Sequence, residues 1–316
     1  MRWMVVGHGG IVGAFVTAID GLDGNEVAVV TGRSEERAGA FAGRRGIPVS
    51  TTDIGSQLEN VDAVYVGTPH PFHADAASRA LEAGVPVLCE KPMTLTLAQT
   101  SEVVELARTN DVFLMEAVWT RFLPIYDQVF GWIDNGAIGT PRGIKASFGF
   151  RKPFDPAHRL FDPALGGGAL YDIGIYPLHV AEWLFGPPVS VVGAAAVGAS
   201  GVDEYTSVLG TYRDGIHGDL SATTRIALDS RAIVWGDDGW IEIPKFWMAQ
   251  EATLHAAGRE EHRSAPFEVN GYEYEIREVA RCLEGGFIES PGMPWSASLS
   301  VASQVDEVLN QVGRSA

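Results

Sequence analysis

Cysteine is scarce in this chain of 316 residues, and the patterns of a secreted or membrane protein are missing. The two cysteines, Cys89 and Cys282, cannot build a disulfide framework and fit a reducing cytoplasm. No run of roughly 18 or more apolar residues is present, so we expect no membrane span. The N-terminal residues enter a strand pattern at once, which leaves no room for a signal peptide. We therefore expect a cytoplasmic protein.

Positive charge is also in short supply. Lys and Arg together number 23 against 40 Asp and Glu, which gives a net charge of −17. A surface of this sign argues against nucleic acid or an anionic membrane as the main partner. The hydrophobic fraction of 46% is too high for a disordered chain, and the length suits about two domains.

The first third of the chain alternates strand and helix patterns. Strands separated by helices of this length predict parallel pairing, in a doubly wound Rossmann sheet that binds ligands beyond the carboxyl ends of its strands. We place this α/β domain at residues 1–120. The expected strands are 3–7, 26–31, 63–67, 85–89 and 112–115, and the expected helices are 11–19, 34–45, 72–83 and 96–109.

Residues 121–316 have a different pattern of predicted secondary structure. Helical stretches at 123–135 and 169–184 are accompanied by many strand-like ones with turn signals between them. This pattern predicts an α+β domain on a large, mostly antiparallel open sheet. The expected strands are 143–150, 189–197, 205–212, 218–224, 231–235, 240–243, 252–256 and 262–267, and helices at 272–283 and 296–312 close the chain.

A glycine-rich turn follows the first strand. The stretch Gly7-His8-Gly9-Gly10-Ile11-Val12-Gly13 lies between a strand and a helix, the context in which a dinucleotide fingerprint is meaningful. Gly7 permits the tight turn, and Gly9 lets a pyrophosphate approach the helix N-terminus. Val12 stands where the usual fingerprint has Gly or Ala. We predict dinucleotide contacts at Gly7, Gly9, Gly10 and Ile11; the alternative is a glycine-rich turn in a non-binding α/β fold.

The end of the second strand bears on the choice of cofactor. A carboxylate there would bind the ribose 2′-hydroxyl of NAD, but the sequence reads Thr31-Gly32-Arg33-Ser34. Arg33 suits a 2′-phosphate and Ser34 could donate to it, so NADP is favoured over NAD. In the alternative, Arg33 is solvated and Ser34 merely caps the second helix.

Two further loops follow strand ends. Thr68, Pro69 and His73 come after the third strand, and a capping or packing role for His73 is as good an interpretation as a cofactor contact. Cys89-Glu90-Lys91-Pro92 ends the next strand, where Lys91 lies at the edge that binds ligands. The alternative for Lys91 is a surface lysine in a turn.

Three glycines at 166–168 open a later helix. Asp172 and Tyr176 are four residues apart, so they share a helix face. Tyr176 is a candidate proton donor and acceptor if the ammonium of Lys91 favours its phenolate. The alternative is a dipole-stabilising Asp and a packing Tyr.

Together these motifs resemble those of the Gfo/Idh/MocA family of oxidoreductases. The resemblance spans nearly the whole chain and rests on the glycine turn, Thr68-Pro69, Glu90-Lys91-Pro92 and the Gly-Gly-Ala-Leu-x-Asp-Ile-Gly-x-Tyr segment at 167–176. Segments 115–122 and 172–176 are similar to the branch that contains dimeric dihydrodiol dehydrogenases and NADP-dependent D-xylose dehydrogenases. In the inositol-dehydrogenase branch, His typically takes the position of Tyr176.

The resemblance implies hydride transfer between a nicotinamide and a hydroxyl or carbonyl carbon of a sugar, polyol or cyclic diol. Tyr176 would exchange the proton, Lys91 would assist it, and Asp172 would hold the substrate or Lys91; no metal is expected. Beyond the glycine turn, the implied cofactor contacts are Arg33, Ser34, Thr68, Pro69, His73, Glu90, Lys91, Trp119 and Arg121. The implied substrate contacts are Trp119, Phe154, His158, Arg159, Tyr171, Asp172 and Tyr176.

The resemblance also implies a homodimer formed by stacked C-terminal sheets. The strand 143–150 places Ile144, Ala146, Phe148 and Phe150 on one face, which fits a covered sheet, although helices of the same chain would cover it equally well.

Two other functions compete with this one: an NAD-dependent sugar or inositol dehydrogenase, and a non-catalytic regulator that binds a dinucleotide. The missing carboxylate after the second strand and Tyr176 count against the first. The joint presence of Lys91, Asp172 and Tyr176 counts against the second.

Overall fold

Two compact units make up the computed structural model, which describes residues 1–313. The first unit comprises Met1–Trp119 and Glu268–Ser298, and the second comprises Thr120–Phe267 and the segment from Leu299 onward. This division differs from the expected boundary, because residues 268–298 return to the first unit.

Long-range hydrogen bonds hold this returning segment in the first unit. Asn270 Nδ2 donates to the carbonyl of Ala14 at 2.9 Å, and Trp295 Nε1 donates to the carbonyl of Leu114 at 2.9 Å. Helix α7 (Glu273–Glu284) also packs against α1 (Gly10–Asp20). The bonded residues are 256 and 181 positions apart, so no local sequence pattern reveals the contact.

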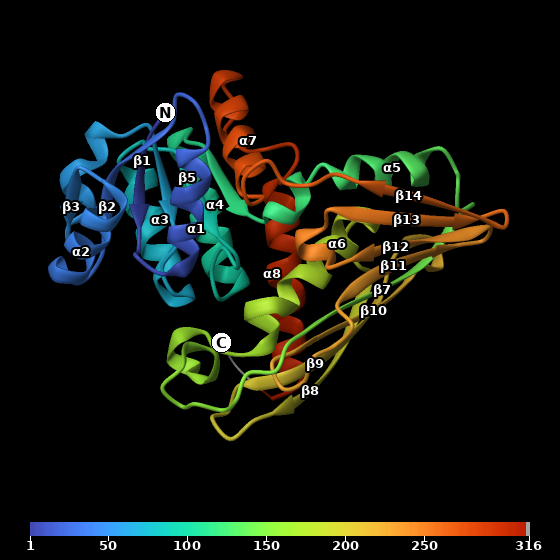
Figure 1. Ribbon diagram of the computed structural model, residues 1–316. Helices are drawn as coiled ribbons and strands as arrows, with labels where there is room; N and C mark the ends of the chain where they lie inside the picture. Colours follow the sequence, from blue (N-terminus) through green and yellow to red (C-terminus); the bar gives the residue numbers. More distant parts are fainter. Residues whose placement is uncertain (314–316) are drawn as a thin grey trace. The chain divides into compact units, whose positions relative to one another are not determined.

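The first unit is built on a six-stranded sheet in the order β3-β2-β1-β4-β5-β6, with every neighbouring pair parallel (Figure 1). Every residue of β4, β5 and β6 is buried, as expected where helices cover both faces. The doubly wound sheet is thus confirmed. Its strands are β1 (Arg2–Val6), β2 (Glu26–Thr31), β3 (Val49–Thr51), β4 (Ala63–Val66), β5 (Val87–Glu90) and β6 (Leu114–Ala117).

The helices that lie between β1 and β6 in the chain are the crossovers of this sheet. Helices α3 and α4 pack against each other. Besides α1 and α7, the helical segments are α2 (Glu35–Arg45), α3 (His73–Glu82), α4 (Leu97–Asn110), the short η1 (Ile54–Asn60) and η2 (His70–Phe72), and η3 (Trp119–Phe122), which begins at the unit's last residue before the chain passes to the second unit.

The second unit is built on an eight-stranded sheet in the order β14-β13-β12-β11-β7-β10-β9-β8. Only β7 and β10 pair in parallel among the described strands of this sheet, which confirms a mostly antiparallel architecture. Its strands are β7 (Pro141–Gly149), β8 (Ser190–Val197), β9 (Asp203–Thr211), β10 (His217–Thr223), β11 (Arg231–Gly236), β12 (Gly239–Pro244), β13 (Glu251–Ala256) and β14 (Arg259–Ser264).

One face of this sheet is covered by the same chain. Helix α6 (Ile175–Phe185) packs on β7 and β10, and Ile144 and Ala146 of β7 are buried. The face that strand alternation picked out is therefore covered within the subunit. Helix α8 (Trp295–Gln311) begins in the first unit and continues from Leu299 in the second. The remaining helical segments of the second unit are α5 (Ile125–Asp134), which packs on β13 and β14, η4 (Arg159–Phe161), η5 (Pro163–Leu165), the π-helical η6 (Leu170–Gly174), η7 (Arg213–Gly215) and η8 (Phe246–Met248).

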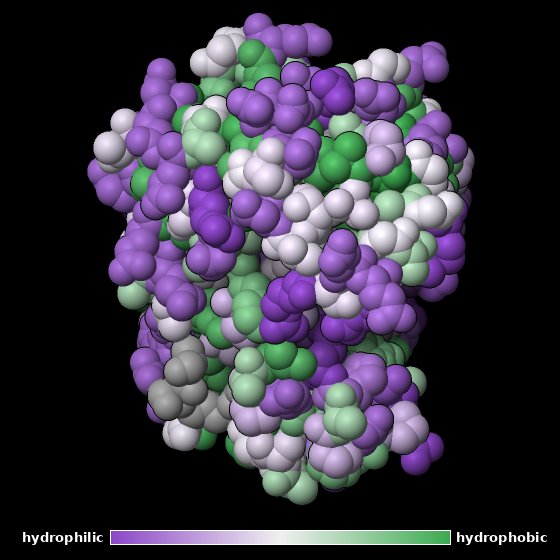
Figure 2. Space-filling model, turned by 90° about the vertical axis from the view of Figure 1, so that its left-hand side faces the viewer, coloured by the Kyte–Doolittle hydropathy of each residue, from purple (hydrophilic) through white to green (hydrophobic). Residues whose placement is uncertain are grey.

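The visible surface is mixed in hydropathy. In Figure 2, hydrophilic side chains are spread over the whole visible face, with apolar residues between them. Across residues 1–313, no helix combines the length and hydropathy that crossing a membrane requires.

Candidate functional site

The turn after β1 brings two strand ends close together. Gly7 has a φ of +116°, and a Cβ atom there would lie 2.7 Å from the carbonyl oxygen of Gly67, just beyond β4. Glycine is the residue that fits both demands. Val12 is fully buried, and its Cγ2 atom would lie 2.7 Å from a Cβ at Gly67. The chain therefore accommodates the unusual valine of its fingerprint by placing a glycine opposite it.

The N-terminus of α1 is open to an anion. Gly9 is the N-cap, no side chain caps the helix, and the first turn holds no acidic residue. Beyond the adjoining backbone, no described atom lies within 4 Å of a Cβ built at Gly9 or Gly10. The first N–H groups of a helix have no intrahelical acceptor and form the positive end of its dipole. This end can therefore hold a phosphate or pyrophosphate.

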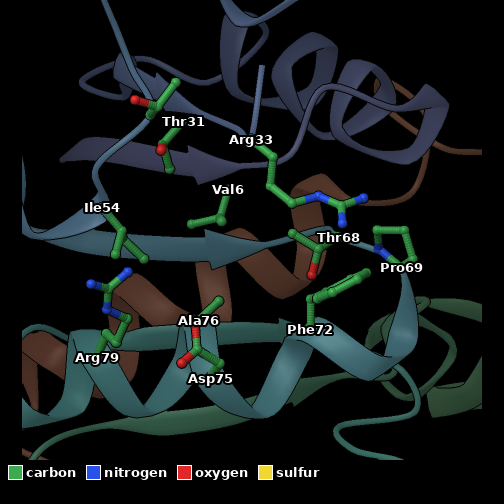
Figure 3. A pocket seen from close by; sticks show the side chains of 11 residues that line it. Val6, Thr31, Arg33, Ile54, Thr68, Pro69, Phe72, Asp75, Ala76 and Arg79 are labelled. Atoms are coloured by element: carbon green, nitrogen blue, oxygen red, sulfur yellow. The ribbon is translucent and has the colours of Figure 1, made fainter. Parts of the chain in front are cut away.

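A pocket of about 120 Å³ lies at the carboxyl ends of β1, β2 and β4 (Figure 3). Arg33 lies over the ring of Phe72, with its Cζ atom 4.4 Å from the ring centroid, and Arg79 enters from α3. The Oγ1 atom of Thr68 is buried without a hydrogen-bond partner in residues 1–313, which marks a place for a polar ligand atom. The pocket is lined by Val6, Thr31, Arg33, Thr52, Ile54, Thr68, Pro69, Phe72, Asp75, Ala76 and Arg79.

The loop between β2 and α2 presents a cation rather than a carboxylate. Thr31 ends β2, and Gly32-Arg33-Ser34 leads into α2. Ser34 is the N-cap of α2 and accepts a hydrogen bond from the backbone N–H of Arg37 at 3.3 Å, so it does have the capping role. Arg33 is exposed, which leaves its guanidinium accessible to a ligand.

His73 joins two of the loops at the strand ends. Its side chain is fully buried, with Nε2 2.8 Å from the carbonyl oxygen of Thr68 and Nδ1 2.9 Å from that of Pro92. Burial lowers the pKa of His73, although both carbonyls oppose this. The structure thus gives His73 a packing role, in which it holds the loop after β4 against the loop after β5.

Lys91 follows β5 in a loop with a cis peptide bond before Pro92. The carboxylate of Glu90 accepts hydrogen bonds from Tyr65 Oη at 2.7 Å and from the backbone N–H of Lys91 at 3.2 Å. Burial raises the pKa of Glu90, and the charge of Lys91 opposes that rise. Glu90 is therefore a buried support for the loop that carries Lys91, which is itself half-buried.

Trp119 and Arg121, two neighbouring candidates, have different surroundings. Trp119 belongs to the first unit and stacks on Tyr272, with ring centroids 4.6 Å apart. Arg121 belongs to the second unit, where it is buried in an ion pair with Glu182 and lies over Trp183 at 5.5 Å. This internal pair accounts for the charge of Arg121 without a ligand.

In the second unit, the candidate Asp172 lies in the π-helical turn η6. A hydrogen bond anchors this turn: the backbone N–H of Leu170 donates to Asp203 Oδ2 at 2.7 Å. Asp172 is buried and forms an ion pair of 2.8 Å with Arg159, whose side chain is half-exposed. Because π-helical turns occur frequently at functional sites, this placement is consistent with a role for Asp172.

Tyr176 lies one residue into α6 and is buried. Its ring centroid is 6.0 Å from that of Phe148, which stacks on Trp247 at 3.6 Å. Tyr171 is also buried, inside η6. The structure thus groups Tyr176 with aromatic side chains of the covered sheet face.

The loop before η4 supplies the remaining substrate candidates. Phe154 is 51% exposed and meets the ring of Phe161 edge-on at 5.1 Å. His158 Nδ1 accepts the backbone N–H of Leu160 at 3.2 Å. Partial burial, with the charges of Lys152 and Arg159, lowers the pKa of His158. This histidine is therefore expected to be neutral at pH 7.

Part of the pocket is formed by residues that no sequence motif pointed to. Phe72, Asp75 and Arg79 belong to η2 and α3, and Thr52 and Ile54 follow the unpredicted strand β3. The position of Phe72 just after a strand-end loop was a usable signal, but nothing local marks Arg79. Within residues 1–313, no group of three His, Cys, Asp or Glu side chains is placed to hold a metal ion.

Two family models match the chain. The model described as an oxidoreductase family with an NAD-binding Rossmann fold matches residues 1–118. The model of the GFO/IDH/MocA C-terminal domain matches residues 126–242.

Similar proteins extend over the full chain. The chain is 34% identical over 329 residues to a trans-1,2-dihydrobenzene-1,2-diol dehydrogenase of Xenopus laevis, covering 99% of this chain and 98% of the relative. The enzyme of that name from Homo sapiens is 34% identical over 335 residues, with coverage of 99% and 97%. A solved 3-ketoreductase from Actinomadura kijaniata, in complex with NADP and TDP-benzene, has a TM-score of 0.89 at 28% identity, with coverage of 99% and 98%.

Proposed function

Because the chain belongs to the GFO/IDH/MocA family of oxidoreductases, we propose that it is an NADP-dependent enzyme that transfers hydride between a nicotinamide and a hydroxyl or carbonyl carbon of a cyclic diol or a sugar. The observation that carries the cofactor choice is Arg33, stacked over Phe72 at a strand end without a carboxylate. The dihydrodiol dehydrogenases with matching length support the substrate class, and the 3-ketoreductase solved with NADP supports the cofactor.

The first unit has groups that fit each charged part of this cofactor. The open N-terminus of α1 would hold the pyrophosphate, and Arg33 would pair with the 2′-phosphate. The hydroxyl of Ser34 accepts from Arg37, so its own proton can be donated to the same phosphate. The pocket between Phe72 and Thr68 would take the adenosine. When bound, the nicotinamide supplies or accepts the hydride.

The second unit supplies the candidate acid and base. In this proposal Tyr176 exchanges a proton with the substrate oxygen, and the ammonium of Lys91 favours its phenolate. Arg159 orients the carboxylate of Asp172 through their 2.8 Å ion pair, and Asp172 binds a substrate hydroxyl. These roles rest on the family resemblance and on the placement of Asp172 and Tyr176 in adjoining helical turns.

Aromatic side chains of the second unit suit a ring-shaped substrate. Phe148 and Trp247 present a stacked pair near Tyr176, and Phe154 exposes half of its surface. Such faces pack on the carbon skeleton of a cyclic diol or a sugar, while His158 as a neutral imidazole can bind its hydroxyls.

A cofactor titration followed by a substrate panel tests this function. Binding of NADPH and NADH is compared by fluorescence, and cyclic trans-diols, aldoses and polyols are then screened by the absorbance of reduced nicotinamide. We expect tighter binding of NADPH and turnover with at least one diol or sugar. Tighter binding of NADH would favour the NAD-linked alternative, and binding without turnover would favour a regulator.

We also propose that the enzyme is a homodimer formed through the open face of the eight-stranded sheet. On that face the cross-strand pair Val192 and Leu209 is 62% and 59% exposed, and the pair Trp235 and Trp240 is 39% and 41% exposed. These pairs lie on the side of the sheet away from Ile144. Apolar side chains of this size on a flat sheet are typical of an interface.

A cytoplasmic location is part of the same proposal. Cys89 and Cys282 are buried thiols, as expected for a protein of a reducing compartment. Subcellular fractionation with an antibody against the protein tests it.

A further inference from the structure

One buried carboxylate of the first unit has no part in the chemistry proposed so far. Glu275 on α7 has no exposed surface, and neither of its carboxyl oxygens has a hydrogen-bond partner within residues 1–313. An ionised carboxylate is costly in such a place unless it is paired. The environment of Glu275 therefore favours the neutral acid.

The start of α7 is held firmly by hydrogen bonds just before Glu275. Glu273 accepts backbone N–H groups with both carboxylate oxygens, at 2.6–3.1 Å. Asn270, just before the helix, is bonded to α1. Ile276, the next residue, and Val279, one turn further on, are buried as well, so Glu275 belongs to the packed side of the helix.

The neighbours of Glu275 are Tyr65 and Glu90. Tyr65 pairs with Leu88, and Glu90 is two residues further along β5, so Tyr65 and Glu90 lie on the same face of the sheet. Phe15 of α1 stacks on Tyr65 at 3.7 Å, which identifies this face as the one against which α1 packs. Helix α7 packs on α1, and Glu275 on this helix interacts electrostatically with both Tyr65 and Glu90.

The two carboxyl groups differ in what surrounds them. Glu90 accepts hydrogen bonds from Tyr65 Oη and from the N–H of Lys91, and the Lys91 ammonium adjoins it in the chain. Glu275 has no comparable donor. Burial and the negative charge of Glu90 raise the pKa of Glu275 well above its ordinary value. Tyr65, Lys91 and Glu116 also act on Glu90, Tyr272 acts on Tyr65, and Glu90 in turn raises the pKa of Cys89.

We propose that Glu90 and Glu275 form a carboxyl pair that carries a single negative charge, with the proton kept on Glu275. The pair then presents one anion to the one ammonium of Lys91. An ionised Glu275 would place a second, uncompensated charge beside Glu90. Glu116 lies on the opposite face of the sheet, where it accepts the backbone N–H of Met93 at 2.9 Å, and its charge adds to the rise in the pKa of Glu90.

Glu275 is therefore a positioning residue, which acts on Lys91 through Glu90. This role in catalysis rests on the function proposed above, whereas the position of the proton does not. The two claims can be tested separately.

Thermal unfolding of Glu275→Gln against pH tests where the proton lies. When folding raises the pKa of an acid, the folded protein becomes less stable as the pH rises above the pKa of that acid in the unfolded chain. Replacing the acid by glutamine removes this pH-dependent loss of stability. We expect the melting temperature of the variant, relative to that of the wild type, to be about 2–4 °C higher at pH 8 than at pH 5. Glu284→Gln, at an exposed position on the same helix, is the control and should show no such change.

Glu90→Gln provides a second variant. Without the charge of Glu90, Glu275 should ionise more readily, so the pH-dependent gain from Glu275→Gln should shrink in that background. A gain that is constant with pH, or unaffected by Glu90→Gln, would overturn the shared charge. If the shared charge holds but Lys91→Ala leaves turnover normal, the proposed catalytic role fails and the buried pair stands.

Discussion

The two sheets of this protein place functional groups in different ways. In the parallel sheet, β4, β5 and β6 are buried throughout, so the candidate side chains of this unit lie in the loops where strands end. In the eight-stranded sheet, burial alternates along β7 and β11, and one face is covered by α6. Candidate residues of the second unit therefore come from the covering turns and helix. Candidate residues of the first unit are therefore found by looking at strand ends. Those of the second unit are found by asking which face of a strand or helix they lie on.

Loss of the proposed proton exchange should have the largest effect. We expect Tyr176→Phe and Lys91→Ala each to lower turnover by about 100-fold or more, because general acid–base catalysis contributes at least that much. Binding of NADPH should stay largely intact, as measured by fluorescence titration. Tyr205→Phe, on a strand of the same unit, is the matched control. Near-normal turnover in both active-site variants with a good substrate would refute these roles.

The strand-end site of the first unit is tested by Arg33→Ser. Losing a charge-assisted hydrogen bond to a phosphate should weaken NADP binding by about 10- to 100-fold, with little change for NAD. Arg37→Ala, an exposed arginine on α2, controls for general charge and should leave both affinities unchanged. Equal losses for NADP and NAD would mean that Arg33 does not select the cofactor.

The sequence predicted the order of elements well where periodicity is strong. The parallel strands from β1 to β6 were found apart from β3, whose three residues Val49–Thr51 carry no periodic signal. The return of residues 268–298 to the first unit was not predictable, since it depends on contacts such as that of Asn270 with Ala14. Local patterns report periodicity, and they do not report which distant surface an amphipathic helix packs against.

The candidate site was predictable where chemistry follows a strand end. Arg33, predicted to pair with a 2′-phosphate, lines a pocket at the strand ends. His73 and Arg121 were both predicted as cofactor contacts, with packing weighed equally for His73, and the structure shows both in buried internal interactions. Glu275 was not predicted at all, because a charged residue in an amphipathic helix is ordinarily assigned to solvent, and this one is fully buried. Burial of single polar residues depends on tertiary packing that the sequence pattern does not contain.

The open sheet face should respond to a new charge. We expect the wild type to have twice the mass of one chain in light scattering, and Leu209→Lys to be a monomer, because a buried unpaired ammonium disfavours association. Val269→Lys, at another exposed apolar position, should leave the dimer intact. A monomeric wild type would remove the dimer from the proposal.

The smallest effect is expected at the histidine that joins two strand-end loops. Burial lowers the pKa of His73 in the folded state, so the unfolded chain takes up the proton first as the pH falls. Stability should therefore be complete above the ordinary histidine value and fall from about pH 7.5 to about pH 5.5, by about 2–4 °C in melting temperature. His73→Gln should melt lower at neutral pH, because the link between Thr68 and Pro92 is weakened, yet show a flatter pH dependence. His262→Gln, on the exposed strand β14, should retain the wild-type slope. If the melting temperature of His73→Gln depended on pH as strongly as that of the wild type, the loss of stability in acid would arise from other groups than His73.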